Sequence, residues 1–383
     1  MGRAQSSLVA LLVLAGLSAA AQAAAETTAA WQFSGDLRFG YFNETREPRT
    51  GPSSRNDEGR IRLRVAVDGA LGEHWETRAR LAGRYSTSAA PDRFYLRFDA
   101  PTRSGARFGD TTIDELYLQR RARDGSWQIR AGRFHSGVNL LGVAGKALDR
   151  KDFPNVGINW TDGVQVELDL ADGWRGRFEL QYNDRDGIGQ GTEAPLDFSR
   201  GGSRVGTYTA LVGEADGIWA QRMLAVTWFP NALAAQGIAE AARKDYVALD
   251  GKLAAAWPLG DAGMRLLLGG EVGFAPNRPD RSVLATGGSG RADGLAWQIS
   301  ANLLDMAPGH NIGVVYARIG AGWLLSPDFR GNDALAEVRY QWRFTPRWSM
   351  EARYRIREEI KIPVTAPRER QDTDFYIRLT GRF

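Results

Sequence analysis

Residues 336–357 have the sequence Ala336-Glu337-Val338-Arg339-Tyr340-Gln341-Trp342-Arg343-Phe344-Thr345-Pro346-Arg347-Trp348-Ser349-Met350-Glu351-Ala352-Arg353-Tyr354-Arg355-Ile356-Arg357. Apolar and polar side chains alternate on both sides of the short Thr-Pro segment. A period of two is that of a β-strand, in which successive side chains point to opposite faces of the sheet. The stretch therefore predicts a hairpin with one apolar, aromatic face and one face rich in Arg.

The same alternation recurs along most of the chain. From Gly59, the apolar residues of the segment 61–67 alternate with Arg60, Arg62 and Arg64, and the pattern resumes at Trp75 after a turn. Counting such segments predicts sixteen strands, near residues 31–42, 59–71, 75–86, 112–122, 126–135, 160–171, 174–184, 204–213, 218–229, 245–257, 263–275, 293–304, 311–323, 333–344, 347–360 and 373–383. Three of them, at 204–213, 218–229 and 311–323, alternate poorly, so fourteen or eighteen strands also fit.

Composition excludes several classes of protein. The chain of 383 residues has no Cys and three His, which leaves little material for a disulfide framework or a metal cluster. Beyond residue 21, no stretch approaches the ~20 apolar residues of a membrane-spanning helix. The aromatic residues, 10% of the total, argue against disorder, and the 45 Gly favour β structure with many turns.

The first 25 residues have the pattern of an export signal. Arg3 precedes an apolar run from Leu8 to Leu17, and Ala21-Gln22-Ala23 resembles a cleavage site. We expect residues 1–25 to be a cleaved signal peptide, with a retained anchor as the alternative, and residues 26–383 to form a single domain. Export without Cys is typical of a bacterial envelope protein.

Three features favour a barrel in lipid over a soluble β-sandwich. The predicted strands of 10 to 14 residues match the ~9 to 11 residues that cross a bilayer at a tilt. Short turns alternate with long loops, and seven Trp residues lie beside the short turns: Trp31, Trp75, Trp127, Trp174, Trp219, Trp257 and Trp348. The sequence therefore predicts an all-β protein, a transmembrane antiparallel up-and-down β-barrel.

Two segments resemble the bacterial outer-membrane porins. The chain ends in a strand, Asp374 to Phe383, that looks like the assembly signal of outer-membrane barrels, and residues 112–119 and 127–134 are similar to the fourth and fifth porin strands. The resemblance implies that Phe383 addresses the barrel-assembly machinery, that the barrel is a homotrimer, and that the loop from His135 to Asn159 folds inward. Such a loop would narrow the channel with its charged residues, Lys146, Asp149, Arg150, Lys151 and Asp152. A secondary resemblance is to alginate-export channels, which also have an Arg-lined lumen.

The polar faces of the strands would line a water-filled lumen, since side chains cannot fill a barrel of this size. The predicted basic wall consists of Arg60, Arg62, Arg64, Arg78, Arg80, Arg130, Arg175, Arg177, Arg339, Arg343, Arg353, Arg355 and Arg357. Rings of Arg in a confined space concentrate anions. The alternative is that these residues pair with nearby Glu and Asp and merely keep the lumen polar.

These observations predict a porin for passive diffusion of small hydrophilic solutes, anionic or neutral, with a bias towards anions. The alternatives are a selective channel for acidic sugars, oligosaccharides or organic acids, and a non-conducting barrel that serves as an adhesin or anchor. The sequence predicts no enzymatic activity, no cofactor and no metal, because no Ser and His meet on the predicted wall. Nucleic acid is not an expected partner, whereas outer-membrane lipid and lipopolysaccharide are.

Overall fold

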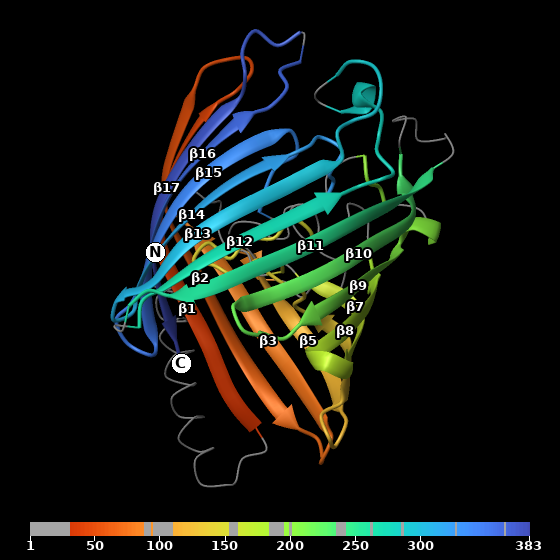
Figure 1. The fold of residues 1–383 in the computed structure, drawn as a ribbon, viewed down its shortest axis with the longest axis vertical. Helices are drawn as coiled ribbons and strands as arrows, with labels where there is room; N and C mark the ends of the chain where they lie inside the picture. Colours follow the sequence, from red (N-terminus) through yellow and green to blue (C-terminus); the bar gives the residue numbers. More distant parts are fainter. Residues whose placement is uncertain are drawn as a thin grey trace.

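A computed structural model of the chain shows a closed antiparallel β-barrel of sixteen long strands (Figure 1). It describes residues 31–87, 93–94, 110–152, 160–183, 195–198, 201–234, 243–260, 263–284, 287–325, 328–363 and 365–383. The predicted signal peptide, residues 1–25, lies outside the described residues. Within the described part of the chain, no helix has the length and the apolar composition to cross a membrane.

The strands follow one another around the barrel in chain order. They are β1 (Trp31–Glu47), β2 (Ser54–Ala70), β3 (Trp75–Ser86), β5 (Asp110–Arg121), β6 (Trp127–Phe134), β7 (Thr161–Asp169), β8 (Trp174–Tyr182), β9 (Val205–Gly213), β10 (Trp219–Leu233), β11 (Lys244–Pro258), β12 (Arg265–Phe274), β13 (Leu295–Ala307), β14 (His310–Ile319), β15 (Asp333–Arg343), β16 (Trp348–Glu359) and β17 (Gln371–Arg382). A two-residue strand, β4 (Arg93–Phe94), pairs in parallel with β5. The described parts of the connections contain three single turns of 3-10 helix, η2 (Ala171–Gly173), η3 (Gly201–Ser203) and η4 (Arg281–Val283).

The prediction of an all-β barrel with sixteen strands is confirmed, and each predicted strand overlaps an observed one. Of the predicted strands that are too long, 311–323 differs most, because β14 ends at Ile319 rather than at residue 323. The chain leaves the wall there because Trp323 turns into the barrel and covers Gly273 of β12, where a Cβ atom would lie 2.5 Å from the indole ring. The indole N–H donates to the carbonyl oxygen of Leu148 at 2.9 Å.

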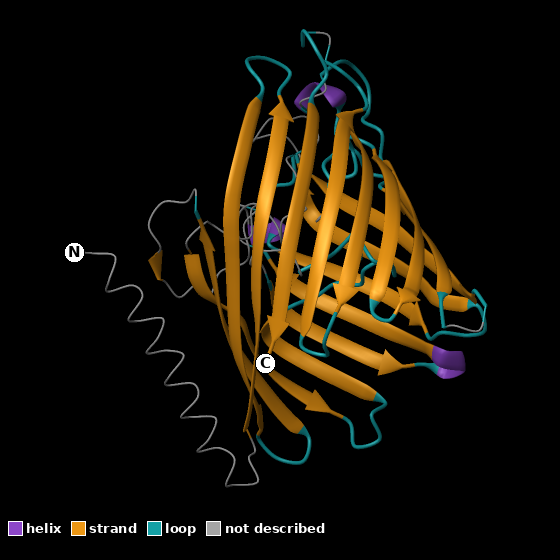
Figure 2. Ribbon diagram, turned by 90° about the vertical axis from the view of Figure 1, so that its left-hand side faces the viewer, coloured by secondary structure: helices purple, strands orange, loops and turns teal. Residues whose placement is uncertain are grey.

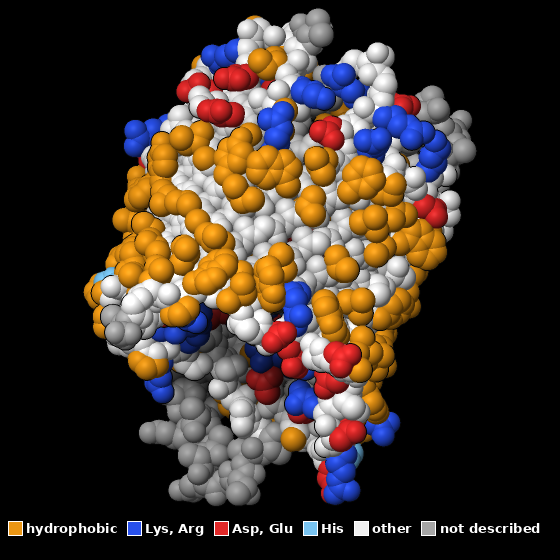
Figure 3. Space-filling view, in the orientation of Figure 1, with side chains coloured by type: hydrophobic (Ala, Val, Ile, Leu, Met, Phe, Trp, Pro, Cys, Tyr) orange, Lys and Arg blue, Asp and Glu red, His pale blue; other side chains and the backbone are white. Residues whose placement is uncertain are grey.

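The outer face of the barrel is apolar, and large hydrophobic side chains such as Phe39, Leu224 and Ile299 are more than half exposed on it. Figure 3 shows hydrophobic side chains over much of this face, with charged ones towards both ends. The short connections, including residues 71–74, 170–173, 308–309 and 344–347, lie at one end of the barrel and the longer loops at the other (Figure 2). Six strands begin with a Trp residue at the short-turn end: Trp31, Trp75, Trp127, Trp174, Trp219 and Trp348. This arrangement matches the aromatic girdle of barrels in a bilayer.

The barrel closes where β17 pairs with β1. At the short-turn end of this seam, Gly35 and Phe383 exchange backbone hydrogen bonds, from the Gly35 N–H to the Phe383 carbonyl at 2.8 Å and from the Phe383 N–H to the Gly35 carbonyl at 3.1 Å. The ring of Phe383 covers Gly35, whose Cβ atom would lie 2.5 Å from it. The last residue of the chain therefore completes the outer face of the seam.

We predict that Phe383→Ala reduces the fraction of protein that assembles, because the variant exposes the backbone of the seam to lipid. The measurement is the shift in gel mobility between unheated and boiled samples of the membrane fraction. The control is Phe33→Ala, which removes another exposed ring, from the outer face of β1. Equal loss of folded protein in both variants would contradict a special role for the terminal residue.

Candidate channel lumen and its inward-folded loop

Arginine side chains gather on the inner face of five neighbouring strands, β16, β17, β1, β2 and β3. In the strand register, Arg38 of β1 is directly opposite Arg62 of β2, and Arg62 is directly opposite Arg84 of β3. Arg62 and Arg84 are buried among these neighbours. Directly opposed like charges destabilise a sheet. This row of three guanidinium groups is therefore held by the acidic groups around it.

Two aspartates hold the row and its neighbours in place. Arg62 donates to Asp36 at 2.6 Å, while Arg64 and Arg80 lie 3.0 and 2.8 Å from the carboxylate oxygens of Asp114. Asp114 is fully buried. It contacts side chains of two strands at once, because it accepts hydrogen bonds from Arg80 of β3 and forms an ion pair with Arg64 of β2, so it fixes the geometry of this part of the wall.

The alternation of the sequence did not identify Asp114 as a residue of the inner face. The register between β3 and β5 shifts at this point: Arg80 pairs with Glu115, but the next residue, Leu81, pairs with Ile113. A bulge of this kind turns two successive residues towards one face. The signal is present in the sequence, because the outward apolar positions change from odd at Ile113 to even at Leu116.

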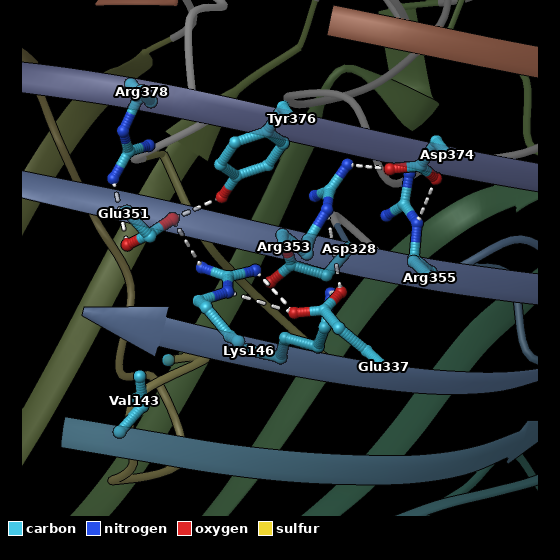
Figure 4. A network of polar contacts seen from close by, with 12 residues as sticks. Val143, Lys146, Asp328, Glu337, Glu351, Arg353, Arg355, Asp374, Tyr376 and Arg378 are labelled. Carbon is cyan, nitrogen blue, oxygen red and sulfur yellow. Dashed lines mark hydrogen bonds and ion pairs between the residues drawn. The ribbon is translucent and has the colours of Figure 1, made fainter.

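A second charged cluster lies on β15, β16 and β17 (Figure 4). Arg339 donates to Glu337 at 2.6 Å and to Glu351 at 3.3 Å. Both Arg353 and Arg355 donate to Asp374, the latter at 2.5 Å. The guanidinium of Arg353 also lies 4.3 Å from the ring centre of Tyr376, a favourable cation–π distance.

The remaining residues of the predicted wall have different surroundings. Arg60 pairs with Glu44 and Glu58, Arg78 pairs with Asp68 and Glu115, and Arg357 donates to the carbonyl oxygen of Asp328. Four predicted residues lie outside the two clusters. Arg130 contacts Gln119 on β5, Arg177 and Arg175 pair with Glu167 and Asp169 on β7, and Arg343 is exposed at the short-turn rim. The Arg-rich wall thus spans β16 to β3, and most of its charges have an acidic partner.

The loop that follows β6 lies inside the barrel from His135 to Asp152; residues 153–159 are outside the described part of the chain. Lys146 forms an ion pair with Glu337 of β15 at 3.0 Å (Figure 4). The backbone N–H of Leu148 donates to Glu271 of β12 at 2.8 Å, and that of Val143 donates to Asn302 of β13 at 2.8 Å. The loop therefore packs on the wall formed by β11 to β15, across the lumen from β2 and β3.

Glycines on the inner face of that wall make room for the loop. Leu140 lies over Gly269 of β12, where a Cβ atom would be 3.2 Å from it, and Val143 lies over Gly313 of β14, where the distance would be 3.0 Å. Both distances are tighter than ordinary contacts, so a larger residue at either position would push the loop away. The side chains of Leu140 and Val143 thus fill the space that side chains at positions 269 and 313 would otherwise occupy.

Lys252 of β11 fixes the far end of the loop segment. Its ammonium lies 2.7 Å from Asp149, 2.6 Å from Asp250 and 2.7 Å from Glu271. These three carboxylates also have the spacing of a metal site. The ammonium contacts all three of them, so Lys252 already supplies the cation of this cluster. Tyr208 donates to the second oxygen of Asp149 at 3.1 Å.

The charged residues of the loop point into the barrel wall instead of into the passage. Arg150 lies 3.1 Å from Glu179 and Lys151 lies 2.9 Å from Asp328, while Asp152 accepts from Thr161 at 2.6 Å. The side chain that the loop leaves most open is Leu141, which is 41% exposed. The sequence had suggested that the loop charges line a constriction, but burial inside the barrel made their pairing with the wall more favourable.

His135 begins the loop, just beyond β6. Burial, together with the charge of Arg80, lowers the pKa of the imidazole to about 4, so the ring is neutral at pH 7. One of its nitrogens lies 3.4 Å from Asp114. The start of the loop is thus tied to the same aspartate that holds Arg64 and Arg80.

Comparison with solved structures agrees with this architecture. OccAB3 of Acinetobacter baumannii matches 92% of this chain over 100% of its own length, with a TM-score of 0.54 and 10% identity. OccD3 (OpdP) of Pseudomonas aeruginosa matches 92% of this chain over 91% of its length (TM-score 0.53, 10% identity), and OccK8 (OprE) of the same organism matches 92% over 98% (TM-score 0.52, 13% identity). All three are outer-membrane porins. The chain has the fold of a bacterial outer-membrane porin.

The likeness is one of fold, since the identities are only 10 to 13%. No protein-family model matches the chain, and no curated protein matches it significantly. Information on function therefore comes from two features of this porin-fold barrel, the inward loop and the paired Arg wall.

We predict that Lys252→Met destabilises the barrel by about 3 kcal/mol, because three carboxylates would then face one another without a cation. Asp250→Asn is the matched control, since Lys252 keeps Asp149 and Glu271 in that variant. The measurement is thermal unfolding of the detergent-solubilised barrel followed by circular dichroism. If the two variants unfold at the same temperature, the ammonium does not hold the loop.

Proposed function

We propose that this protein is an outer-membrane channel through which small hydrophilic solutes diffuse passively, and that its Arg-rich wall gives the channel a bias towards anions. The fold supports an outer-membrane channel. The bias rests on one observation above all: Arg38, Arg62 and Arg84 are direct neighbours on three adjacent strands. Such a row costs stability and is poorly explained by a need for polarity alone, which Ser, Thr or Gln would meet.

The inward loop supports a narrowed passage beside that wall. The loop covers the inner face of β11 to β15, so the space that is left lies between the loop and the Arg-rich strands. Arg353 is held by Asp374 and keeps 11% of its side chain exposed. Arg62 is buried beside Asp36, so its charge acts on ions through the field of the wall and not by direct contact. The exposed side chain of the loop, Leu141, is apolar and adds no charge to the lumen.

A selective channel for acidic sugars, oligosaccharides or organic acids is the second candidate. It is favoured by the rigidity of the wall, because fixed guanidinium forks can bind carboxylates in two-point contacts. Block of the current that saturates with one such solute would distinguish it from general diffusion. A non-conducting adhesin or anchor is the third candidate, and a folded barrel without conductance would support it.

The proposal includes no catalysis and no cofactor. Among the described residues, His135 is buried against Asp114, and His74 and His310 lie at or beside short turns. None of these positions has the open nucleophile and base that hydrolysis requires. Recognition of Phe383 by the assembly machinery, surrounding lipopolysaccharide and trimer formation remain part of the proposal.

We predict that the mature protein in planar bilayers prefers chloride over potassium across a KCl gradient, and that the variant with Arg60, Arg62, Arg64, Arg353 and Arg355 changed to Gln loses this preference. The measurement is the reversal potential. The control is Arg175→Gln, which removes an exposed Arg that pairs only at the rim. Cation preference of the unmodified channel would contradict the anion bias while leaving the channel intact.

The acidic partners allow a test in the opposite direction. Asp374 neutralises two guanidinium groups at once, those of Arg353 and Arg355. We predict that Asp374→Asn increases the chloride preference, because the wall then gains one net positive charge. The shift of the reversal potential should shrink at high salt, where charges are screened. An unchanged potential at low salt would show that this cluster does not face the permeating ions.

A further inference from the structure

A groove of about 620 Å³ crosses the outer face of β10 to β13. Leu224, Leu253, Val272 and Ile299 border it, and Gly251 and Gly270 lie between them. In the register, Gly251 is flanked by Leu224 and Val272, and Gly270 by Leu253 and Ile299. Figure 3 shows a pale area without hydrophobic side chains in the middle of this face, between hydrophobic side chains on both sides.

The barrel itself does not fill this groove. Gly69 and Gly381 show what happens elsewhere, because Trp31 and Trp348 cover them so closely that a Cβ atom would clash. A Cβ atom at Gly251 would only touch Leu224 at 3.5 Å, and one at Gly270 would meet nothing closer than 3.9 Å. Larger side chains would therefore fit at both positions. The two glycines therefore leave a space on the outer face that a molecule packed against the barrel can fill.

A positive charge lies at the short-turn end of the groove. Arg222 is the fourth residue of β10 and borders the groove together with Trp174 of β8. Its guanidinium lies 5.3 Å from the ring centre of Trp174 and donates to the backbone carbonyl of Glu214 at 2.9 Å. The carboxylate of Asp216 is 3.9 Å away and largely exposed. An Arg this close to the membrane boundary can extend its charge to the headgroup level.

We propose that the groove binds one acyl chain of a phospholipid, with the lipid phosphate at Arg222. Two parts of the site indicate this ligand. The apolar groove, at membrane depth, fits a hydrocarbon chain, and the guanidinium of Arg222, at the short-turn rim, fits a phosphate. By the topology of outer-membrane barrels, the short turns face the periplasm, so the lipid belongs to the inner leaflet. The inference rests on the proposed function only in that the barrel spans a bilayer.

Native mass spectrometry of the detergent-solubilised protein with added phosphatidylglycerol tests the site. We expect the unmodified protein to retain this lipid. The double variant Gly251→Leu with Gly270→Leu fills the groove and should retain roughly tenfold less, as should Arg222→Gln, which removes the contact to the phosphate. Gly59→Leu is the matched control, because Gly59 lies on β2, which is not adjacent to β8 or to β10–β13, and a Cβ atom there would meet nothing closer than 3.4 Å. Its lipid retention should be unchanged.

Equal retention by the filled, Arg222 and unmodified proteins would overturn the proposal. So would an oligomer of the unmodified protein that the groove-filling variant converts to monomers, because the groove would then bind a second copy of the chain. Heat-dependent gel mobility shows that each variant is folded. Conductance of the same samples separates the two claims: a conducting barrel without bound lipid refutes only the lipid site, and a lipid-binding barrel without conductance refutes only the channel.

Discussion

The rest of the structure depends on the closure of the sheet between β17 and β1. In hydrocarbon, an unpaired backbone N–H or C=O group costs several kcal/mol, so a sheet can span a membrane only if it has no edge. Pairing of residues 36–47 with residues 371–382 removes the last edge, and Phe383 completes it at the short-turn end. Closure also brings the first and last strands side by side, and so joins Arg residues that are more than 300 positions apart into one wall.

Closure creates an enclosed lumen, and enclosed charges need partners. This requirement explains why the wall and the loop use so many ion pairs. Asp114 holds Arg64 and Arg80, and Asp374 holds Arg353 and Arg355. The loop is fastened by two ion pairs, from its Lys146 to Glu337 of β15 and from its Asp149 to Lys252 of β11. Glycines provide the space that other parts of the structure fill. Glycines on the inner face seat the loop, whereas on the outer face some glycines are covered by aromatic rings and others are left open to lipid.

The predictions from the sequence succeeded where the signal was local. Alternation within a strand depends only on neighbouring residues, so the strand positions and the sixteen-strand barrel could be predicted from it. They failed where a distant contact decides the local structure. β14 ends early because Trp323 packs on Gly273, and Asp114 points inward because of a bulge opposite Arg80. The loop charges were assigned to the passage, but their partners on β8, β11 and β15 could not be identified from spacing alone.

The sequence by itself determined the class of fold, the apolar outer face, the Arg-rich inner face and the Trp residues at one rim, because each of these follows from the period of two and from the positions of short turns. Only the tertiary structure decided which Arg residues are neighbours, which carboxylates hold them, which wall the loop packs on, and where the outer face is left open. Those features depend on the register between strands that are far apart in the chain, and one residue of shift would reverse every side chain involved.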